Sequence, residues 1–147
     1  MRGVWILLVM LALGSVPARA VLGEDVASVA SDAQAFGGNH VMVPRVGFNL
    51  HQITLKDGTV VNEFVSPAGT VFGVSWQGRF VPDLHQLLGT YITNLQQGQR
   101  TRVVRRRAVT IQGNNFVFSS MGHLRSFRGR AYVPSLVPDS VTAEVVQ

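Results

Sequence analysis

The chain has 147 residues, with 13 Lys and Arg against 8 Asp and Glu, 46% apolar residues and no cysteine. This length fits a single domain, and the apolar content excludes a wholly disordered chain. Without cysteine the protein has no disulfide, no thiolate metal site and no cysteine nucleophile. A domain of this size can bury enough surface to fold on its hydrophobic core alone.

The first twenty residues have the pattern of a secretory signal. Arg2 supplies a positive start, residues 4–13 are an unbroken apolar run, and residues 18–20 (Ala-Arg-Ala) place small side chains before a cleavage site. The apolar run is shorter than the roughly 20 residues that span a bilayer, although an uncleaved anchor is the alternative. We expect cleavage near Ala20, a periplasmic or secreted location, and one mature domain (21–147) without a transmembrane helix.

Residues 24–36 predict a short helix. Apolar side chains recur at helical spacing, acidic residues stand near the start, and Gly37-Gly38 marks the end. The apolar face is thin, so we expect this helix to lie at the periphery of the domain.

The next part of the chain predicts three antiparallel strands. Residues 46–56, 59–66 and 70–76 are rich in β-forming side chains. Asp57-Gly58 favours a tight hairpin with a type I′ turn between the first two strands. The segment 67–69 (Pro-Ala-Gly) supplies the second turn, so consecutive hairpins form a meander.

Residues 82–97 give the clearest helix. Large apolar side chains follow the i, i+3, i+4, i+7 spacing and form one stripe, and Gly98 is expected to end the helix. Such a stripe needs a sheet face to cover it. Further strands are expected at 108–112, 115–120 and 130–133, with a weakly alternating edge strand at 141–146.

These elements predict an α+β fold. An antiparallel β-meander sheet of about five to seven strands carries one amphipathic helix packed on a face, with the short N-terminal helix beside it. The residues expected to supply most of the core are Phe48, Leu50, Phe64, Val65, Val71, Phe72, Val74, Trp76, Leu84, Leu87, Leu88, Tyr91, Ile92, Leu95, Val109, Ile111, Phe116 and Phe118.

Charge is distributed unevenly along the chain. Residues 84–138 contain eight arginines and no acidic residue, whereas residues 21–83 carry a net charge of −3. The arginines fall in a run at 100–107 and in a segment around His123. The candidate residues for binding an anion or a partner are Arg105, Arg106, Arg107, His123, Arg125, Arg128 and Arg130.

The basic half of the chain favours a binding function. Nucleic acid is an unlikely partner, because the chain is expected to be exported and its arginine run lacks interleaved aromatic residues for base stacking. The expected partner is an anionic envelope component or an envelope protein, and the expected function is a non-enzymatic binding or envelope-associated module. The alternative for the arginine run is a solvated loop or an edge strand whose charges prevent aggregation. A structural component that offers a free strand edge is a further hypothesis.

Catalytic signatures are weak. The histidines at 40, 51, 85 and 123 show none of the spacings of a metal site, so no metal or cofactor is expected. His123 follows Ser119 and Ser120, and the alternative function is a small hydrolase or isomerase that uses His123. No nucleophile elbow accompanies these residues.

Two other polar residues are expected to have ordinary structural roles. His51 lies in the middle of a predicted strand, so a half-exposed position is expected. Glu63 also lies in a strand and is expected to pair across strands with Lys56 or with an arginine.

Several segments together resemble a known protein family. They are 12–14 (ALG), 28–37 (SVASDAQAFG), 62–78 (NEFVSPAGTVFGVSWQG), 82–89 (PDLHQLLG), and the stretch from 122–124 (GHL) through 129–134 (GRAYVP). The chain is similar in them to small exported proteobacterial proteins known only as a domain of unknown function. The resemblance covers nearly all of the mature chain. It implies export and no particular chemistry.

Overall fold

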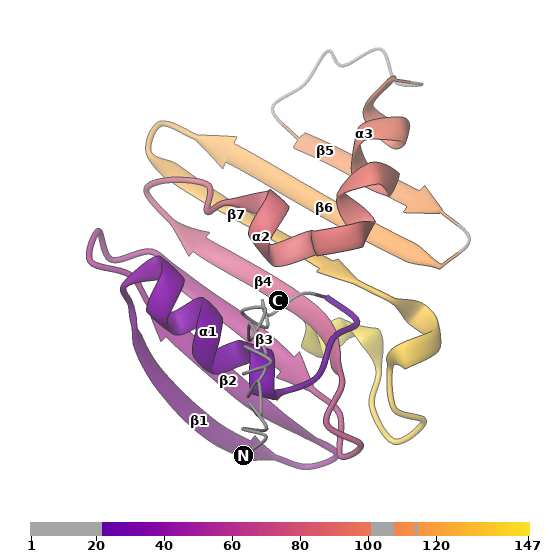
Figure 1. Ribbon diagram of the computed structural model, residues 1–147. Helices are drawn as coiled ribbons and strands as arrows, with labels where there is room; N and C mark the ends of the chain where they lie inside the picture. The colour runs from indigo at the N-terminus through magenta and orange to yellow at the C-terminus, as the bar shows by residue number, and fades with distance from the viewer. Residues whose placement is uncertain (1–21, 101–107, 114) are drawn as a thin grey trace, which may run out of the picture.

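The computed structural model describes residues 22–100, 108–113 and 115–147. Its strands form one seven-stranded antiparallel sheet in the order β1-β2-β3-β4-β7-β6-β5 (Figure 1). The strands are β1 (Asn39–Arg45), β2 (Phe48–Thr54), β3 (Val60–Val65), β4 (Val71–Gly78), β5 (Ala108–Gly113), β6 (Phe116–His123) and β7 (Ser126–Tyr132). Two meanders therefore meet at the β4–β7 pair, and the predicted α+β class with an antiparallel sheet is confirmed.

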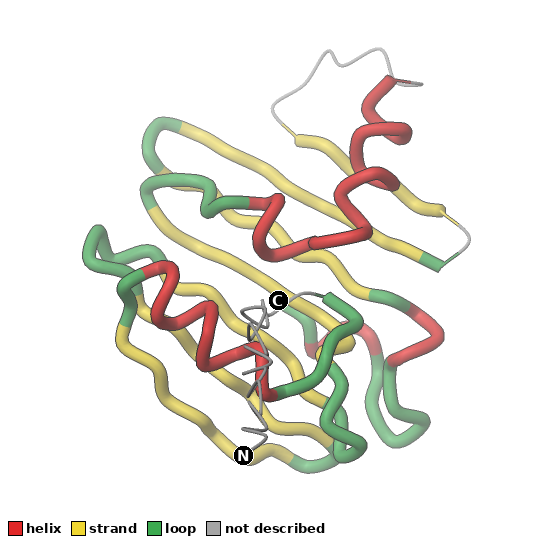
Figure 2. The backbone as a smooth tube through the Cα atoms, viewed as in Figure 1, coloured by secondary structure: helices red, strands yellow, loops and turns green. Residues whose placement is uncertain are grey.

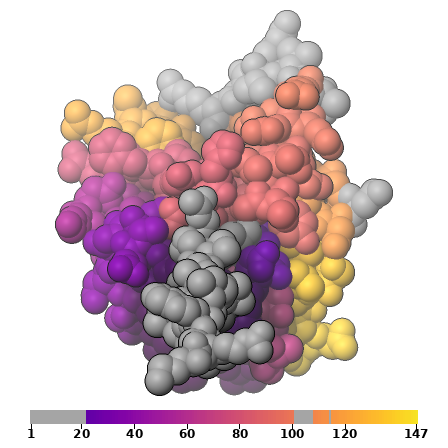
Figure 3. Space-filling view, viewed as in Figure 1, coloured from indigo at the N-terminus to yellow at the C-terminus, as the bar shows by residue number. Residues whose placement is uncertain are grey.

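The helices cover one face of this sheet, which we call the inner face (Figure 2). They are α1 (Ala27–Phe36), α2 (Leu84–Leu88), a 3₁₀ turn (Gly89–Tyr91) and α3 (Ile92–Arg100). In the space-filling view α1, in indigo and purple, adjoins the α2–α3 segment (Figure 3). Val29 of α1, Leu87 and Leu88 of α2 and Leu95 of α3 pack with Trp76 and other sheet residues in one buried cluster.

The predicted helix over 82–97 differs in three respects. It begins after Asp83, whose side chain accepts hydrogen bonds from the backbone N–H groups of His85 and Gln86. It changes to a 3₁₀ turn at Gly89, and it continues through Gly98 to Arg100. A Cβ at Gly98 would lie 2.5 Å from Cγ2 of Ile111, so this glycine permits close approach of α3 to β5 and does not end the helix.

The strand predicted over 46–56 is β2 (Phe48–Thr54), and a turn at Val46 and Gly47 connects it to β1 (Asn39–Arg45), which was not predicted. β1 was missed because this edge strand is largely exposed and contains Pro44. The hairpin at Asp57-Gly58 is confirmed, but its predicted type I′ turn is wrong. Gly58 has φ +83°, while Asp57 is not among the residues with positive φ, and a type I′ turn requires positive φ at both central positions.

The C-terminal segment covers part of the opposite, outer face of the sheet (Figure 1). The edge strand predicted over 141–146 is wrong, because the segment forms 3₁₀ turns at Pro134–Leu136 and Ala143–Val145. Val146 is fully buried against Phe64 and Phe72 of the outer face. The valines that suggested an edge strand therefore pack onto the sheet surface.

All predicted core residues contribute to the interior. The buried ones are Phe64, Val65, Val71, Phe72, Val74, Trp76, Leu87, Leu88, Leu95, Ile111, Phe116 and Phe118. Those at the rim are Phe48, Leu50, Leu84, Tyr91, Ile92 and Val109. In the described part of the chain, no helix combines the length and the apolar character needed to cross a membrane.

Candidate ligand-binding groove on the outer sheet face

A row of polar side chains crosses the outer face of the sheet. Gln52, Asn62, Ser75, Arg130 and Ser119 are successive neighbours in register across β2, β3, β4, β7 and β6. Directly opposed residues of paired strands point to the same face, so the pairing alone gathers these five side chains. We call them the polar row.

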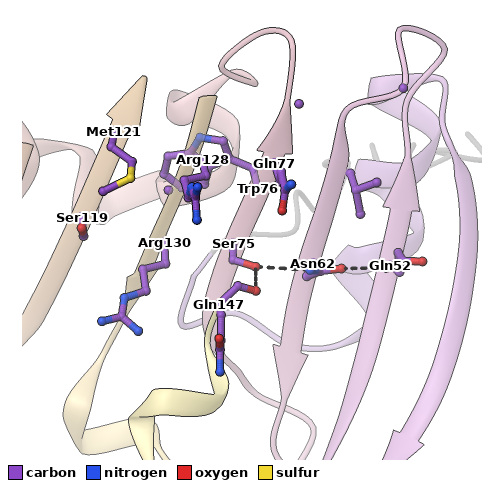
Figure 4. Close-up of a pocket in the computed structure, with 14 residues that line it drawn as sticks. Gln52, Asn62, Ser75, Trp76, Gln77, Ser119, Met121, Arg128, Arg130 and Gln147 are labelled. Carbon is purple, nitrogen blue, oxygen red and sulfur yellow. Dashed lines mark hydrogen bonds between the residues drawn. The ribbon is translucent and has the colours of Figure 1, made fainter. Parts of the chain in front are cut away.

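Hydrogen bonds join the first three members of the polar row (Figure 4). Nε2 of Gln52 donates to Oδ1 of Asn62 at 3.2 Å, and Nδ2 of Asn62 donates to Oγ of Ser75 at 3.3 Å. Each amide still has polar atoms that these two bonds do not use, because Asn and Gln carry two donors and an acceptor. The row is thus ordered and still able to bind further groups.

The C-terminal segment forms a wall at one end of the row. Oγ of Ser75 donates to the main-chain oxygen of Gln147 at 2.7 Å, and Nη1 of Arg130 donates to the carbonyl of Val146 at 3.1 Å. Val146 lies directly over Gly73, where a Cβ would come within 2.7 Å of its Cγ2. The position of Arg130 is therefore fixed by a segment that is itself anchored in the core.

The row forms the floor of an open groove of about 720 Å³. The lining residues are Gln52, Gly58, Val60, Asn62, Ser75, Trp76, Gln77, Gly78, Ser119, Met121, Arg128, Gly129, Arg130 and Gln147. This lining includes two arginines and no acidic side chain. The side chains that line the groove therefore carry a net positive charge.

The two arginines are two residues apart on β7 and so project from the same face, about 7 Å apart along the strand. Arg128 is exposed and makes no hydrogen bond or ion pair with any residue that the structure describes. Arg130 is half-buried, and a guanidinium has five N–H donors, of which the bond to Val146 uses one. Both side chains can therefore contact an anion in the groove.

The other predicted site residues lie elsewhere. His123 ends β6 and Arg125 lies in the β6–β7 turn, and both are exposed and absent from the groove lining. Arg105, Arg106 and Arg107 lie outside the described residues. The structure thus brings together Arg128 and Arg130 of the predicted set.

Sequence reasoning missed Gln52, Asn62 and Ser75. Each is a common polar residue in a strand, and each alternates with buried neighbours such as Ile53 and Val61. That alternation was a signal that their side chains share the outer face. Only the register shows that they are adjacent.

A second polar assembly is buried beneath α1 on the inner face. Glu63 is 1% exposed and Asp32 of α1 is fully buried, so the predicted pairing of Glu63 with Lys56 or an arginine is wrong. Burial, and then the charge and hydrogen bonding of Asp32, raise the pKa of Glu63 to about 9. Oδ1 of Asp32 accepts a hydrogen bond of 2.8 Å from Nε2 of Gln86 in α2. The two carboxyl groups therefore share a proton near neutral pH and connect both helices to the sheet.

His51 extends this assembly towards the sheet edge. It is 9% exposed, not half-exposed as predicted, and it is the cross-strand neighbour of Glu63. Its Nδ1 lies 2.9 Å from Nε2 of His40, and the two rings stack. Burial, and then the charge of His40, lower the pKa of His51. No group of three metal-ligating side chains is found among the described residues.

One comparison identifies the family. A family model described as protein of unknown function (DUF2844) matches residues 18–146. The chain belongs to the DUF2844 family. The resemblance to a domain of unknown function is thereby confirmed. No curated protein and no solved structure matches this DUF2844 chain.

The DUF2844 description names no activity, so we infer what the groove can bind from the chemistry of its lining residues. Its lining offers amides, two serine hydroxyls and two guanidinium groups, with no histidine and no carboxylate side chain. Hydrogen-bond donors and positive charge suit the binding of an anion that also carries hydroxyl groups. In this DUF2844 chain the groove therefore presents groups that can contact such an anion.

Proposed function

We propose that this protein is an exported, non-enzymatic binding module whose outer-face groove binds an anionic component of the cell envelope. The observation that carries the proposal is the position of Arg128 and Arg130 in an open groove without an acidic side chain. Guanidinium groups bind carboxylate or phosphate with paired hydrogen bonds, which are stronger than those between neutral groups.

The polar row points to an acidic polysaccharide as the class of ligand. The amides of Gln52 and Asn62 and the hydroxyl of Ser119 are partly exposed, and they offer donors and acceptors that match sugar hydroxyls, beside arginines that match acidic groups. The groove is open along the sheet, so it can accept a segment of a longer chain. The spacing of the two arginines allows contacts with successive acidic groups.

The groove is tested with a double substitution. Arg128→Ala with Arg130→Ala is expected to weaken the binding of a labelled oligogalacturonate by about 10- to 100-fold, because each charge-assisted contact contributes roughly 1.5 kcal/mol or more. Binding is measured by fluorescence anisotropy. Affinity of the unmodified protein should fall as salt rises, because salt screens exposed charges.

Two further variants make this test specific. Arg45→Ala with Arg100→Ala removes the same charge from exposed positions outside the groove and is expected to change affinity less than threefold. Changing Arg105, Arg106 and Arg107 to Ala tests the predicted arginine run. Loss of binding in that triple variant alone, with full affinity in the groove variant, would place the anion site in the run and refute the proposal.

The export half of the proposal rests on the signal pattern of residues 1–20. N-terminal sequencing of the protein recovered from the periplasm or the medium is expected to begin at Val21. Replacing Ala18 and Ala20 with Leu removes the small residues at the cleavage site, so the uncleaved chain should accumulate. Recovery of an intact N-terminus from the cytoplasm of cells producing the unmodified chain would contradict export.

A further inference from the structure

Three connections lie together at one end of the sheet (Figure 1). They are the β2–β3 turn, the segment between β4 and α2, and the β6–β7 turn. Register places them side by side, since Val60 at the start of β3 pairs with Gln77 of β4, and Gly78 pairs with Phe127 of β7. We call this end the tip.

Large apolar side chains protrude from the tip. Phe80 is 61% exposed, Val81 is 42% exposed and Leu124 is 84% exposed. Single exposed apolar residues are ordinary, but a group of three on adjacent loops is typical of a contact surface. None of these three residues belongs to either buried cluster.

The backbone of the β6–β7 turn strengthens this conclusion. His123 pairs with Ser126, and the two residues between them have positive φ, +33° at Leu124 and +66° at Arg125. A turn with positive φ at both central residues favours the sequence Asn-Gly, because most other residues are strained in the left-handed backbone conformation. A leucine at this position opposes local turn stability and exposes apolar surface. The residue is therefore better explained by a partner than by the fold.

Positive charge adjoins the apolar side chains. Arg79 precedes Phe80, Arg125 follows Leu124, and both arginines are exposed. Two carboxylates also lie on these connections. Hydrogen bonding from Thr59 and, to a smaller extent, the charge of Arg79 lower the pKa of Asp57, and the side chain of Asp83 caps α2. Lys56 in the β2–β3 turn is a third exposed cation, so basic side chains outnumber acidic ones by three to two on these connections.

We propose that the tip docks onto an anionic lipid surface. Phe80, Val81 and Leu124 would enter the boundary between headgroups and acyl chains, where an amphipathic surface buries its apolar side chains. Arg79 and Arg125 lie at the depth of the lipid phosphates, which attract cationic side chains. Phe80, Val81 and Leu124 protrude from the tip, so they fit a soft surface that they can enter.

The groove opens towards the same end, because Gly58 and Gly78 are part of its lining. A docked tip would hold the groove beside the membrane. The proposal does not depend on what the groove binds.

The experiment is co-sedimentation with vesicles, using the chain from Val21 to Gln147. All described strands, helices and both hydrophobic clusters lie within residues 22–147, so this chain contains the complete described fold. Vesicles of phosphatidylcholine with phosphatidylglycerol are expected to bind it. Vesicles of phosphatidylcholine alone are expected to bind it at least tenfold more weakly.

Substitutions at the tip separate the two contributions. Phe80→Ser with Leu124→Ser is expected to lower vesicle binding at least tenfold through lost apolar burial. Arg79→Gln with Arg125→Gln is expected to lower it about tenfold through lost charge. Val46→Ser is the matched control, because Val46 is 95% exposed in the β1–β2 turn at the opposite end of the sheet.

The outcomes decide the proposal. Failure of the unmodified chain to bind anionic vesicles would overturn it and would leave a protein partner as the explanation of the apolar tip. Equal binding by the Phe80→Ser, Leu124→Ser variant and by Val46→Ser would also overturn it. Circular dichroism of each variant, expected to be unchanged because all five positions are exposed, shows that a loss of binding is not a loss of fold.

Discussion

Replacing Glu63 with Gln is expected to stabilise the protein at alkaline pH. The pKa of Glu63 is raised to about 9, so between the ordinary carboxyl pKa and pH 9 the folded protein retains a proton that the unfolded chain releases. Stability therefore falls as pH rises through this range, by roughly 1.4 kcal/mol per pH unit for one such group. A glutamine needs no proton, and its amide can donate to Asp32 as the protonated Glu63 does.

The measurement is urea unfolding between pH 7 and pH 9, followed by the fluorescence of Trp76, which is buried. This range lies above the ordinary pKa of histidine, and the pKa of His51 is lowered further, so His51 stays neutral throughout. At pH 8 the Glu63→Gln variant is expected to be more stable than the unmodified protein by roughly 2–4 kcal/mol, with a flatter pH dependence.

Glu144→Gln is the control for this experiment, because Glu144 is exposed in the C-terminal segment. Its stability curve should run parallel to that of the unmodified protein. A Glu63→Gln variant with the same pH slope as the unmodified protein would show that Glu63 does not hold the proton. The assignment of a shared proton to Asp32 and Glu63 would then be wrong.

Replacing Gly129 with Ala is expected to destabilise the protein by about 3 kcal/mol, at the upper end of the usual cost of overpacking. Gly129 of β7 pairs with Trp76 of β4, and a Cβ at Gly129 would lie 2.2 Å from Cζ2 of Trp76. The indole is 2% exposed and packs against Phe118, with ring centroids 5.8 Å apart, so it has little room to move. The strand must shift instead.

Gly113→Ala provides the comparison for this second prediction. A Cβ at Gly113, in edge strand β5, would meet its nearest atom at 3.6 Å, which is ordinary contact. We expect this variant to change stability by less than about 0.5 kcal/mol.

Because Gly129 lies between Arg128 and Arg130, Gly129→Ala should also weaken anion binding in the groove. Stability is measured by thermal and urea unfolding. Equal stability of the Gly129→Ala and Gly113→Ala variants would show that the contact between Gly129 and Trp76 does not limit packing.

The fold could largely be predicted from local patterns. The β-forming side chains of 59–66 and 70–76, together with the turns before them, identified the central strands, and the apolar stripe of 82–97 identified the main helix. β1 could not be recognised in this way, since an edge strand exposes both polar and apolar residues. The pairing of β4 with β7 depends on contacts between segments far apart in the chain, which no local pattern reports.

The groove was only partly predictable, for the same physical reason. Clustering of arginines in the chain singled out Arg128 and Arg130, but charge along a sequence does not show which residues share a face with Asn62 or Ser75. Glu63 illustrates the opposite error. A glutamate in a strand is usually exposed and paired with a base, and only the position of Asp32 on α1 makes it part of a buried carboxyl pair.

The most direct test of the account is an NMR titration of ¹⁵N-labelled protein with oligogalacturonate. The account predicts the largest shifts at backbone amides of Asn62, Ser75, Arg128 and Arg130 and at the side-chain amides of Gln52 and Asn62, with little change in β1 or α1. Shifts confined to residues 100–108, or an absence of shifts at saturating ligand, would contradict the proposal that the outer-face groove is the binding site.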